Sequence, residues 1–134
     1  MVYGGRVQRS ILIVDDEDDF IELLKYRLAG LGYNFLVAKN GVEALTLARE
    51  SKPDLILLDI MLPDLDGLSV CTILRRQPAT KEIPIFFMSA LTSDVTNRTT
   101  TKLAQDYFIK PLDLNRLKLR IAELIQPEIL AQGN

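Results

Sequence analysis

The sequence Ile-Leu-Ile-Val-Asp-Asp at residues 11–16 places two carboxylates directly after four aliphatic residues. An uninterrupted aliphatic run of this length is typical of a strand that is buried on both faces. Further short runs of branched and aromatic residues occupy 35–38, 55–58, 85–88 and 107–109. We therefore expect five buried strands in this chain.

Segments with helical spacing of apolar residues separate the expected strands, at 20–28, 42–48 and 68–74, and a last one follows them at 114–124. Parallel strands need a crossover connection, and the crossover helices then cover both faces of the sheet. The alternation predicts an α/β fold, a doubly wound five-stranded parallel sheet with five helices.

The fourth of these helices should be short or irregular. It falls in Thr92–Lys102, which contains five threonines and Asn97. Threonine and asparagine are mediocre helix formers, because one loses side-chain freedom and the other competes for backbone hydrogen bonds. This segment is the least regular part of the expected fold.

Residues that begin and end helices support the same pattern. Asn40 with Glu43 three residues later predicts a capping box, and Asp113 is a suitable N-cap for the last helix. That helix should run to about Ile125, because Pro127 cannot continue it. The helix boundaries therefore agree with the strand pattern.

The composition is that of an average globular chain, with 134 residues, 48% hydrophobic and 25% charged. This length suits one domain, which we place at 10–126, with a leader at 1–9 and a tail or linker at 127–134. No apolar stretch approaches the roughly 20 residues of a membrane span, and no signal peptide is evident. We expect a cytoplasmic protein with no membrane partner.

The charge and the residue types exclude several functions. A net charge of -2 gives no basic field for direct binding of nucleic acid. The chain contains no His, which excludes a Ser/His/Asp triad, imidazole zinc sites and a phosphohistidine carrier. Cys71 is the single cysteine, and we interpret it as a small buried apolar residue.

Polar residues stand directly after four of the expected strands. Asp15 and Asp16 follow the first strand, Asp59 the third, Ser89 the fourth and Lys110 the fifth. In open α/β sheets, ligands bind beyond the carboxyl ends of the strands, where the strand order reverses. These five side chains should therefore meet at one site.

The chemistry of this site follows from the residue types. Three carboxylates that lie together repel one another unless a cation intervenes, and Mg²⁺ prefers hard oxygen ligands. One Mg²⁺ and the Lys110 ammonium would neutralise the charge of Asp15, Asp16 and Asp59. Such a pocket can receive a phosphoryl group, with a hydroxyl donating to the phosphoryl oxygens.

The motifs at these positions resemble the receiver domain of two-component response regulators over about Ser10 to Ile125. The resemblance rests on several segments in order: Asp15-Asp16, then Leu-Leu-Asp-Ile-Met-Leu-Pro-Asp-Leu-Asp-Gly at 57–67, Met-Ser-Ala at 88–90, and Asp-Tyr-Phe-Ile-Lys-Pro at 106–111. It implies a flavodoxin-like receiver fold with sheet order 2-1-3-4-5.

The resemblance also implies roles for individual residues. Asp59 would be the phosphoacceptor, and Asp16 and Asp59 would bind Mg²⁺ directly together with the backbone carbonyl of Met61. Asp15 would act mainly through metal-bound water. The phosphodonor would be a sensor histidine kinase or a histidine phosphotransfer protein, and the signal would pass to an output domain or a downstream protein.

By the same resemblance, Ser89 and Tyr107 would couple phosphorylation to a change of conformation. Ser89 and Lys110 would hold the phosphoryl oxygens, and Tyr107 would be the aromatic switch residue.

By the resemblance, Met61 and Leu91, two positions after Asp59 and Ser89, would flank the approach of water. Both are apolar and cannot orient water, so we expect a long-lived phosphoprotein.

Three other functions remain open. A receiver-like module could dock without phosphorylation. An aspartyl-phosphate phosphatase would share Asp59 and the metal, although Met61 stands where such enzymes usually carry a second acid. A flavodoxin-like FMN protein would need a phosphate-cradling first loop, and Asp15 and Asp16 would repel a phosphate. We expect a self-phosphorylating and self-dephosphorylating switch rather than a dedicated enzyme.

Overall fold

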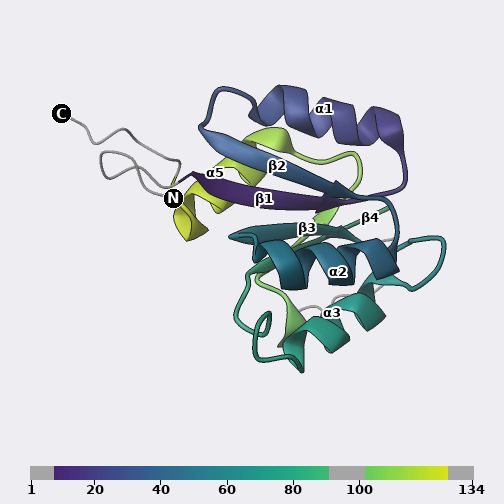
Figure 1. The fold of residues 1–134 in the computed structure, drawn as a ribbon. Coiled ribbons are helices and arrows are strands. Elements are labelled where there is room, and N and C mark those ends of the chain that lie inside the picture. The colour runs from purple at the N-terminus through teal and green to yellow at the C-terminus, as the bar shows by residue number, and fades with distance from the viewer. Residues whose placement is uncertain (1–7, 91–101, 127–134) are drawn as a thin grey trace.

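The computed structural model describes residues 8–90 and 102–126, which form a five-stranded parallel sheet flanked by helices (Figure 1). The elements are β1 Arg9–Val14, α1 Asp18–Leu28, β2 Tyr33–Ala38, α2 Gly41–Ser51, β3 Leu55–Asp59, α3 Gly67–Arg75, β4 Ile85–Ser89, β5 Asp106–Ile109 and α5 Leu114–Leu124. The strand order is β2-β1-β3-β4-β5, which confirms the predicted topology. The expected fourth helix lies almost wholly in 91–101, outside the described residues.

Helices cover both faces of the sheet, as the alternation of elements predicts. Figure 1 shows α1 and α5 on one face and α2 and α3 on the other. Along β1, Ile11 and Ile13 pack with α1 and α5, whereas Leu12 and Val14 pack with α2 and α3. All four side chains are fully buried, because successive residues of a central strand point to opposite covered faces.

Side-chain caps fix the start of three helices, α2, α3 and α5, and Asp66 caps α3 through the Ser69 N–H. The carboxamide of Asn40 accepts a hydrogen bond from the Glu43 backbone N–H at 2.8 Å, as expected for the cap of α2. The reciprocal bond differs from a standard capping box, since the Glu43 carboxylate accepts from the N–H of Lys39. Asp113 caps α5 through the N–H of Arg116, and the helix ends at Leu124.

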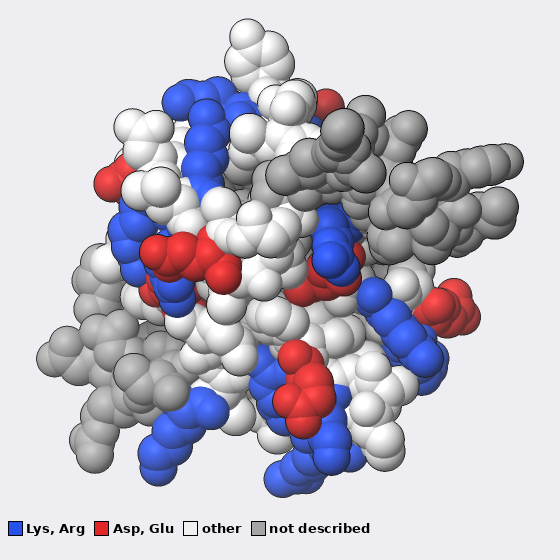
Figure 2. All heavy atoms as spheres, turned by 90° about the vertical axis from the view of Figure 1, so that its left-hand side faces the viewer, with Lys and Arg blue, Asp and Glu red and all other residues white. Residues whose placement is uncertain are grey.

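The face on which β1 begins carries charges of both signs. Figure 2 shows Lys and Arg side chains beside Asp and Glu side chains across this face.

Cys71 is fully buried on α3, as expected for a small apolar residue, and burial raises the pKa of its thiol to about 11. Across the described ranges, no helix is long and apolar enough to cross a membrane.

Candidate functional site

The polar residues predicted to meet do lie together at the carboxyl edge of the sheet. Asp59 and Ser89 are the last residues of β3 and β4, because ladder pairing extends one residue further than the apolar runs predict. Lys110 follows β5, and its backbone N–H donates to the Ser89 carbonyl at 2.8 Å. Adjacent parallel strands thus place these residues side by side.

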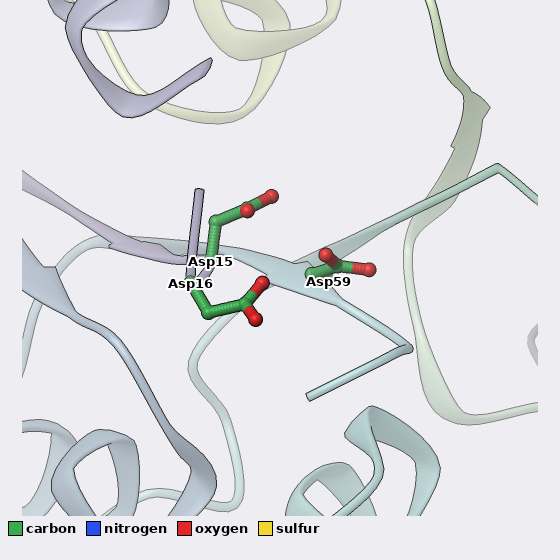
Figure 3. A group of neighbouring side chains, drawn as sticks. All are labelled: Asp15, Asp16 and Asp59. Atoms are coloured by element: carbon green, nitrogen blue, oxygen red, sulfur yellow. The ribbon is translucent and has the colours of Figure 1, made fainter. Parts of the chain in front are cut away.

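Three carboxylates form a compact cluster at this edge. Oxygen atoms of Asp15, Asp16 and Asp59 all lie within 4.8 Å of one another, and Figure 3 shows the side chains at the ends of β1 and β3. Asp15 is fully buried and Asp59 is 4% exposed, whereas Asp16 is exposed. Hard oxygen atoms in this arrangement fit a Mg²⁺ ion, with the exposed Asp16 at the entrance.

The ammonium group of Lys110 reaches into this cluster. Its Nζ donates to Asp15 Oδ2 at 2.7 Å, to Asp59 Oδ2 at 3.2 Å and to Glu17 Oε1 at 3.2 Å. It also lies 4.2 Å from the centroid of the Phe20 ring. Glu17 and Phe20 are site residues that the sequence interpretation missed. An acidic run before a helix is usually solvated, and Phe20 fits the apolar face of the helix that follows.

The electrostatics of Asp59 reflect this crowding. The pKa of Asp59 is raised to about 6, chiefly by burial and also by the nearby Asp15 charge, although the Met61 N–H and Lys110 lower it. Burial would lower the pKa of Lys110, but hydrogen bonds and charge from Asp15 and Asp59 raise it overall. The site therefore holds carboxylates that would be stabilised by an additional cation.

The loop after β3 is fixed by backbone contacts on both sides. The Met61 N–H donates to Asp59 Oδ1 at 2.9 Å, and the Gly67 N–H donates to the Ile60 carbonyl at 2.7 Å. A Cβ atom on Gly67 would lie 2.4 Å from the Asp59 carbonyl oxygen, so only glycine allows this approach of α3. The Met61 side chain itself is 56% exposed.

The same loop is tied to the start of α2. Asp64 accepts hydrogen bonds from the N–H groups of Gly41 at 2.7 Å and Val42 at 3.0 Å. These bonds lower the pKa of Asp64. The loop that follows the candidate phosphoacceptor is therefore anchored to α2 as well as α3.

The side chain of Ser89 interacts with that of Tyr107 and lowers its pKa. Ser89 is fully buried at the end of β4, and burial raises the pKa of Tyr107 on β5. The predicted switch residues therefore lie on neighbouring strands, Ser89 one strand away from Asp59 and Tyr107 two strands away. Leu91, the other residue predicted to flank the site, lies outside the described residues.

The fold and the site define a class of protein. A doubly wound parallel sheet carries a carboxylate cluster, a half-buried lysine and a buried hydroxyl at its carboxyl edge, where such folds bind ligands. Oxygen ligands suit a cation and the lysine suits an anion beside it. The class is that of flavodoxin-like domains with an acidic pocket that could hold a metal ion.

Comparison with known proteins identifies the family within this class. The family described as response regulator receiver domain matches residues 11–122. The chain belongs to this family of two-component response regulator receiver domains.

Curated relatives are regulators of about twice this length. The alkaline phosphatase synthesis transcriptional regulatory protein PhoP of Bacillus subtilis (strain 168) is 37% identical over 126 residues, which cover 93% of this chain and 52% of PhoP. The probable transcriptional regulator ycf27 of Cyanophora paradoxa is 40% identical over 121 residues, covering 89% of this chain and 49% of ycf27. The chain thus spans about half the length of these relatives.

Solved structures show the same fold. A two-component response regulator from Clostridium difficile superposes with a TM-score of 0.81 at 33% identity, covering 87% of this chain and 95% of that one. The receiver domain of the sensor histidine kinase PA1611 from Pseudomonas aeruginosa superposes with a TM-score of 0.79 at 26% identity, covering 88% and 98%. That receiver has a magnesium ion coordinated in its active site cleft.

Proposed function

We propose that Asp59 accepts a phosphoryl group and that the acyl phosphate switches the conformation of the domain. The observation that carries this proposal is the setting of the Asp59 carboxylate. It is nearly buried, Oδ1 accepts from the Met61 N–H, and Oδ2 lies 3.2 Å from the Lys110 ammonium. A carboxylate held in this way is a positioned nucleophile with a cation beside it.

The reaction is transfer from a phosphohistidine on a partner. An oxygen of the Asp59 carboxylate attacks phosphorus, the P–N bond breaks, and its electron pair returns to the imidazole, which takes up a proton. The Lys110 ammonium and the Ser89 hydroxyl would bind the phosphoryl oxygens as negative charge shifts onto them. The same two groups would assist the later attack of water.

The three carboxylates fit a bound Mg²⁺ ion. Asp16 and Asp59 would bind it directly with the backbone carbonyl of Met61, and Asp15 would act mainly through bound water. The support is the cluster of oxygen atoms within 4.8 Å, two of whose residues are buried. When bound, Mg²⁺ supplies positive charge that offsets the carboxylates and the phosphoryl oxygens.

The switch would run through Ser89 and Tyr107. Phosphorylation replaces one negative charge by nearly two and offers new acceptors to the Ser89 hydroxyl. Because the Ser89 side chain interacts with that of Tyr107, a shift of one side chain changes the contacts of the other. The expected result is altered packing of β4, β5 and α5.

The partners follow from the family. Response regulators act with histidine kinases and output domains. For this chain we expect a sensor histidine kinase or histidine phosphotransfer protein as donor, a downstream output domain or protein, and a cytoplasmic location. No observation favours the docking-only module or the phosphatase, and the exposed apolar Met61 side chain offers no acid or base.

Intact-mass measurement tests the proposal. Incubation with Mg²⁺ and acetyl phosphate should add the mass of one phosphoryl group to the wild type, and Asp59→Asn should gain none. Omitting Mg²⁺ should prevent the gain, whereas Asp54→Asn, which removes a carboxylate at the opposite edge of the sheet, should not. A wild type that gains no mass would refute phosphorylation-dependent function and favour the docking module.

Beryllofluoride, a mimic of the phosphoryl group, tests the coupling. Amide chemical shifts should change in β4, β5 and α5 as well as in the loop after Asp59. Changes that stay within that loop would contradict the role given to Ser89 and Tyr107.

A further inference from the structure

The ring of Phe20 forms one wall of the position that the Lys110 ammonium occupies. The Nζ atom lies 4.2 Å from the ring centroid, well within the range of a cation–π contact. Phe20 is the third residue of α1, and its half-buried side chain packs against the core between the sheet, α1 and α5. Core packing holds the ring in place, so the ring offers a fixed face to a flexible lysine.

Among the described residues, the other hydrogen bonds of the Lys110 ammonium are all with carboxylates. Asp15 and Asp59 belong to the cluster that fits a cation, and a cation there competes with the lysine for the same oxygens. Glu17 lies outside that cluster, but its side chain is 66% exposed, where ion pairs are weak and screened by salt. The contact with the neutral ring of Phe20 is weakened neither by a cation that competes for carboxylate oxygens nor by the screening of an exposed ion pair.

The side chain of Lys110 could also adopt rotamers that point away from the carboxylates. Its side chain and Phe20 both line an open groove of about 890 Å³ between the start of α1 and the segment leading into α5. Lysine has four rotatable bonds, and an ammonium gains hydration when it turns toward solvent. Without the ring, the outward rotamers of Lys110 would become populated once a cation binds the carboxylate oxygens that otherwise hold the ammonium.

We propose that Phe20 is a positioning residue that keeps the Lys110 ammonium turned inward for phosphoryl transfer. This rests on the proposed function of Asp59 as phosphoacceptor. Only molecules with the lysine inward are competent, and the observed rate scales with that fraction. By pre-organising Lys110, the ring raises the fraction of molecules with the lysine turned inward, without touching the phosphoryl group itself.

Substitutions of the ring test the proposal through the rate of mass gain with Mg²⁺ and acetyl phosphate. Phe20→Leu keeps an apolar side chain and should slow the gain about three- to tenfold, the size of a partly exposed cation–π contact. Phe20→Tyr should restore most of the rate. Tyr26→Leu is the matched control, because Tyr26 is an aromatic residue of α1 that is 78% exposed, and its rate should equal the wild type.

A ring of unchanged shape guards against a folding defect. Site-specific incorporation of 3,4,5-trifluorophenylalanine at position 20 keeps the volume nearly constant and removes most of the negative charge on the ring face. It should slow the gain as Phe20→Leu does, with an unchanged thermal midpoint. If ring volume alone matters, this protein will react at the wild-type rate and the proposal is wrong.

Two further readouts separate positioning from a structural role. In a Lys110→Met background, where mass gain is followed over longer times, Phe20→Leu should cause no further loss. The ε-methylene protons of Lys110 should show an upfield ring-current shift in the NMR spectrum, with and without Mg²⁺, which Phe20→Leu abolishes. An equal loss of rate in both backgrounds, or the absence of the shift in the wild type, overturns the proposal.

The two proposals fail in different ways. No mass gain in the wild type refutes Asp59 as phosphoacceptor and removes the reaction that Phe20 is proposed to assist. Mass gain in the wild type with the same rate in Phe20→Leu and the fluorinated protein refutes the role of Phe20 alone.

Discussion

Replacement of Gly67 by alanine should disturb the backbone of the phosphoacceptor more than any comparable change at a helix start. The added Cβ would lie 2.4 Å from the Asp59 carbonyl oxygen and 2.7 Å from the Ile60 Cα. Ordinary contact begins at 3.4 Å, so the start of α3 must retreat by about 1 Å. That movement stretches the 2.7 Å bond from the Gly67 N–H to the Ile60 carbonyl beyond hydrogen-bonding distance.

The cost can be estimated from these contacts. The lost hydrogen bond is worth about 1 kcal/mol and the overpacking about 1–3 kcal/mol, while the better helix propensity of alanine returns less than about 1 kcal/mol. The free energy of unfolding should fall by about 2–3 kcal/mol. Mass gain from acetyl phosphate should slow, because Asp59 and Met61 move relative to Lys110.

Gly41 provides the matched control, since it is also the first residue of a helix. A Cβ there meets side-chain atoms, Leu65 Cβ at 2.8 Å and Val70 Cγ2 at 3.0 Å, rather than the backbone of the site. Urea unfolding followed by circular dichroism should rank Gly67→Ala as the less stable variant. A Gly67→Ala protein within about 0.5 kcal/mol of the wild type would refute the reasoning.

Three further changes have defined outcomes. Burial would raise the pKa of Asp106, but hydrogen bonds from Arg120, the Tyr107 N–H and Arg116 lower it below its usual value. The ionised Asp106 therefore stabilises the fold at neutral pH, and this stabilisation is lost as pH falls through the lowered pKa. Asp106→Asn should cost about 1 kcal/mol at pH 7 and flatten the acid limb of the stability curve, and an unchanged limb would contradict this. Millimolar Mg²⁺ should raise the Tm of the wild type more than that of Asp16→Asn, and equal shifts would argue against metal binding at the cluster. Met61→Asn combined with Leu91→Glu should speed dephosphorylation, whereas decay at the wild-type rate would leave the shielding role of these side chains unsupported.

The sheet could be predicted because each strand contains a short apolar run, but the expectation of five buried strands was wrong for the edge strands β2 and β5, which are only partly buried. Central parallel strands are buried on both faces, so they appear as continuous apolar runs such as 11–14 and 55–58. The site followed from the same logic, since the carboxyl ends of parallel strands share one edge. Asp15, Asp59 and Lys110 could therefore be placed together although they are distant in sequence.

Contacts set by side-chain packing between elements could not be predicted. Phe20 and Lys110 are 90 positions apart, and their contact depends on how α1 packs against the segment after β5. Asp64 reaches across to α2 from another loop. Arg75 donates to the carbonyls of Leu103 and Ile83, a role that nothing in its sequence neighbours signals. Long polar side chains on a helix satisfy many alternative partners, and only the tertiary structure selects among them.

The central claim is that the phosphoryl group is carried by the carboxylate of Asp59. Borohydride reduces an acyl phosphate of aspartate to homoserine, which marks the modified position permanently. After treatment with Mg²⁺ and acetyl phosphate, peptide mass spectrometry of the reduced protein should find homoserine at position 59 and aspartate at positions 15 and 16. Homoserine at either of those positions, or aspartate at position 59 in a protein that has gained the phosphoryl mass, would contradict the account.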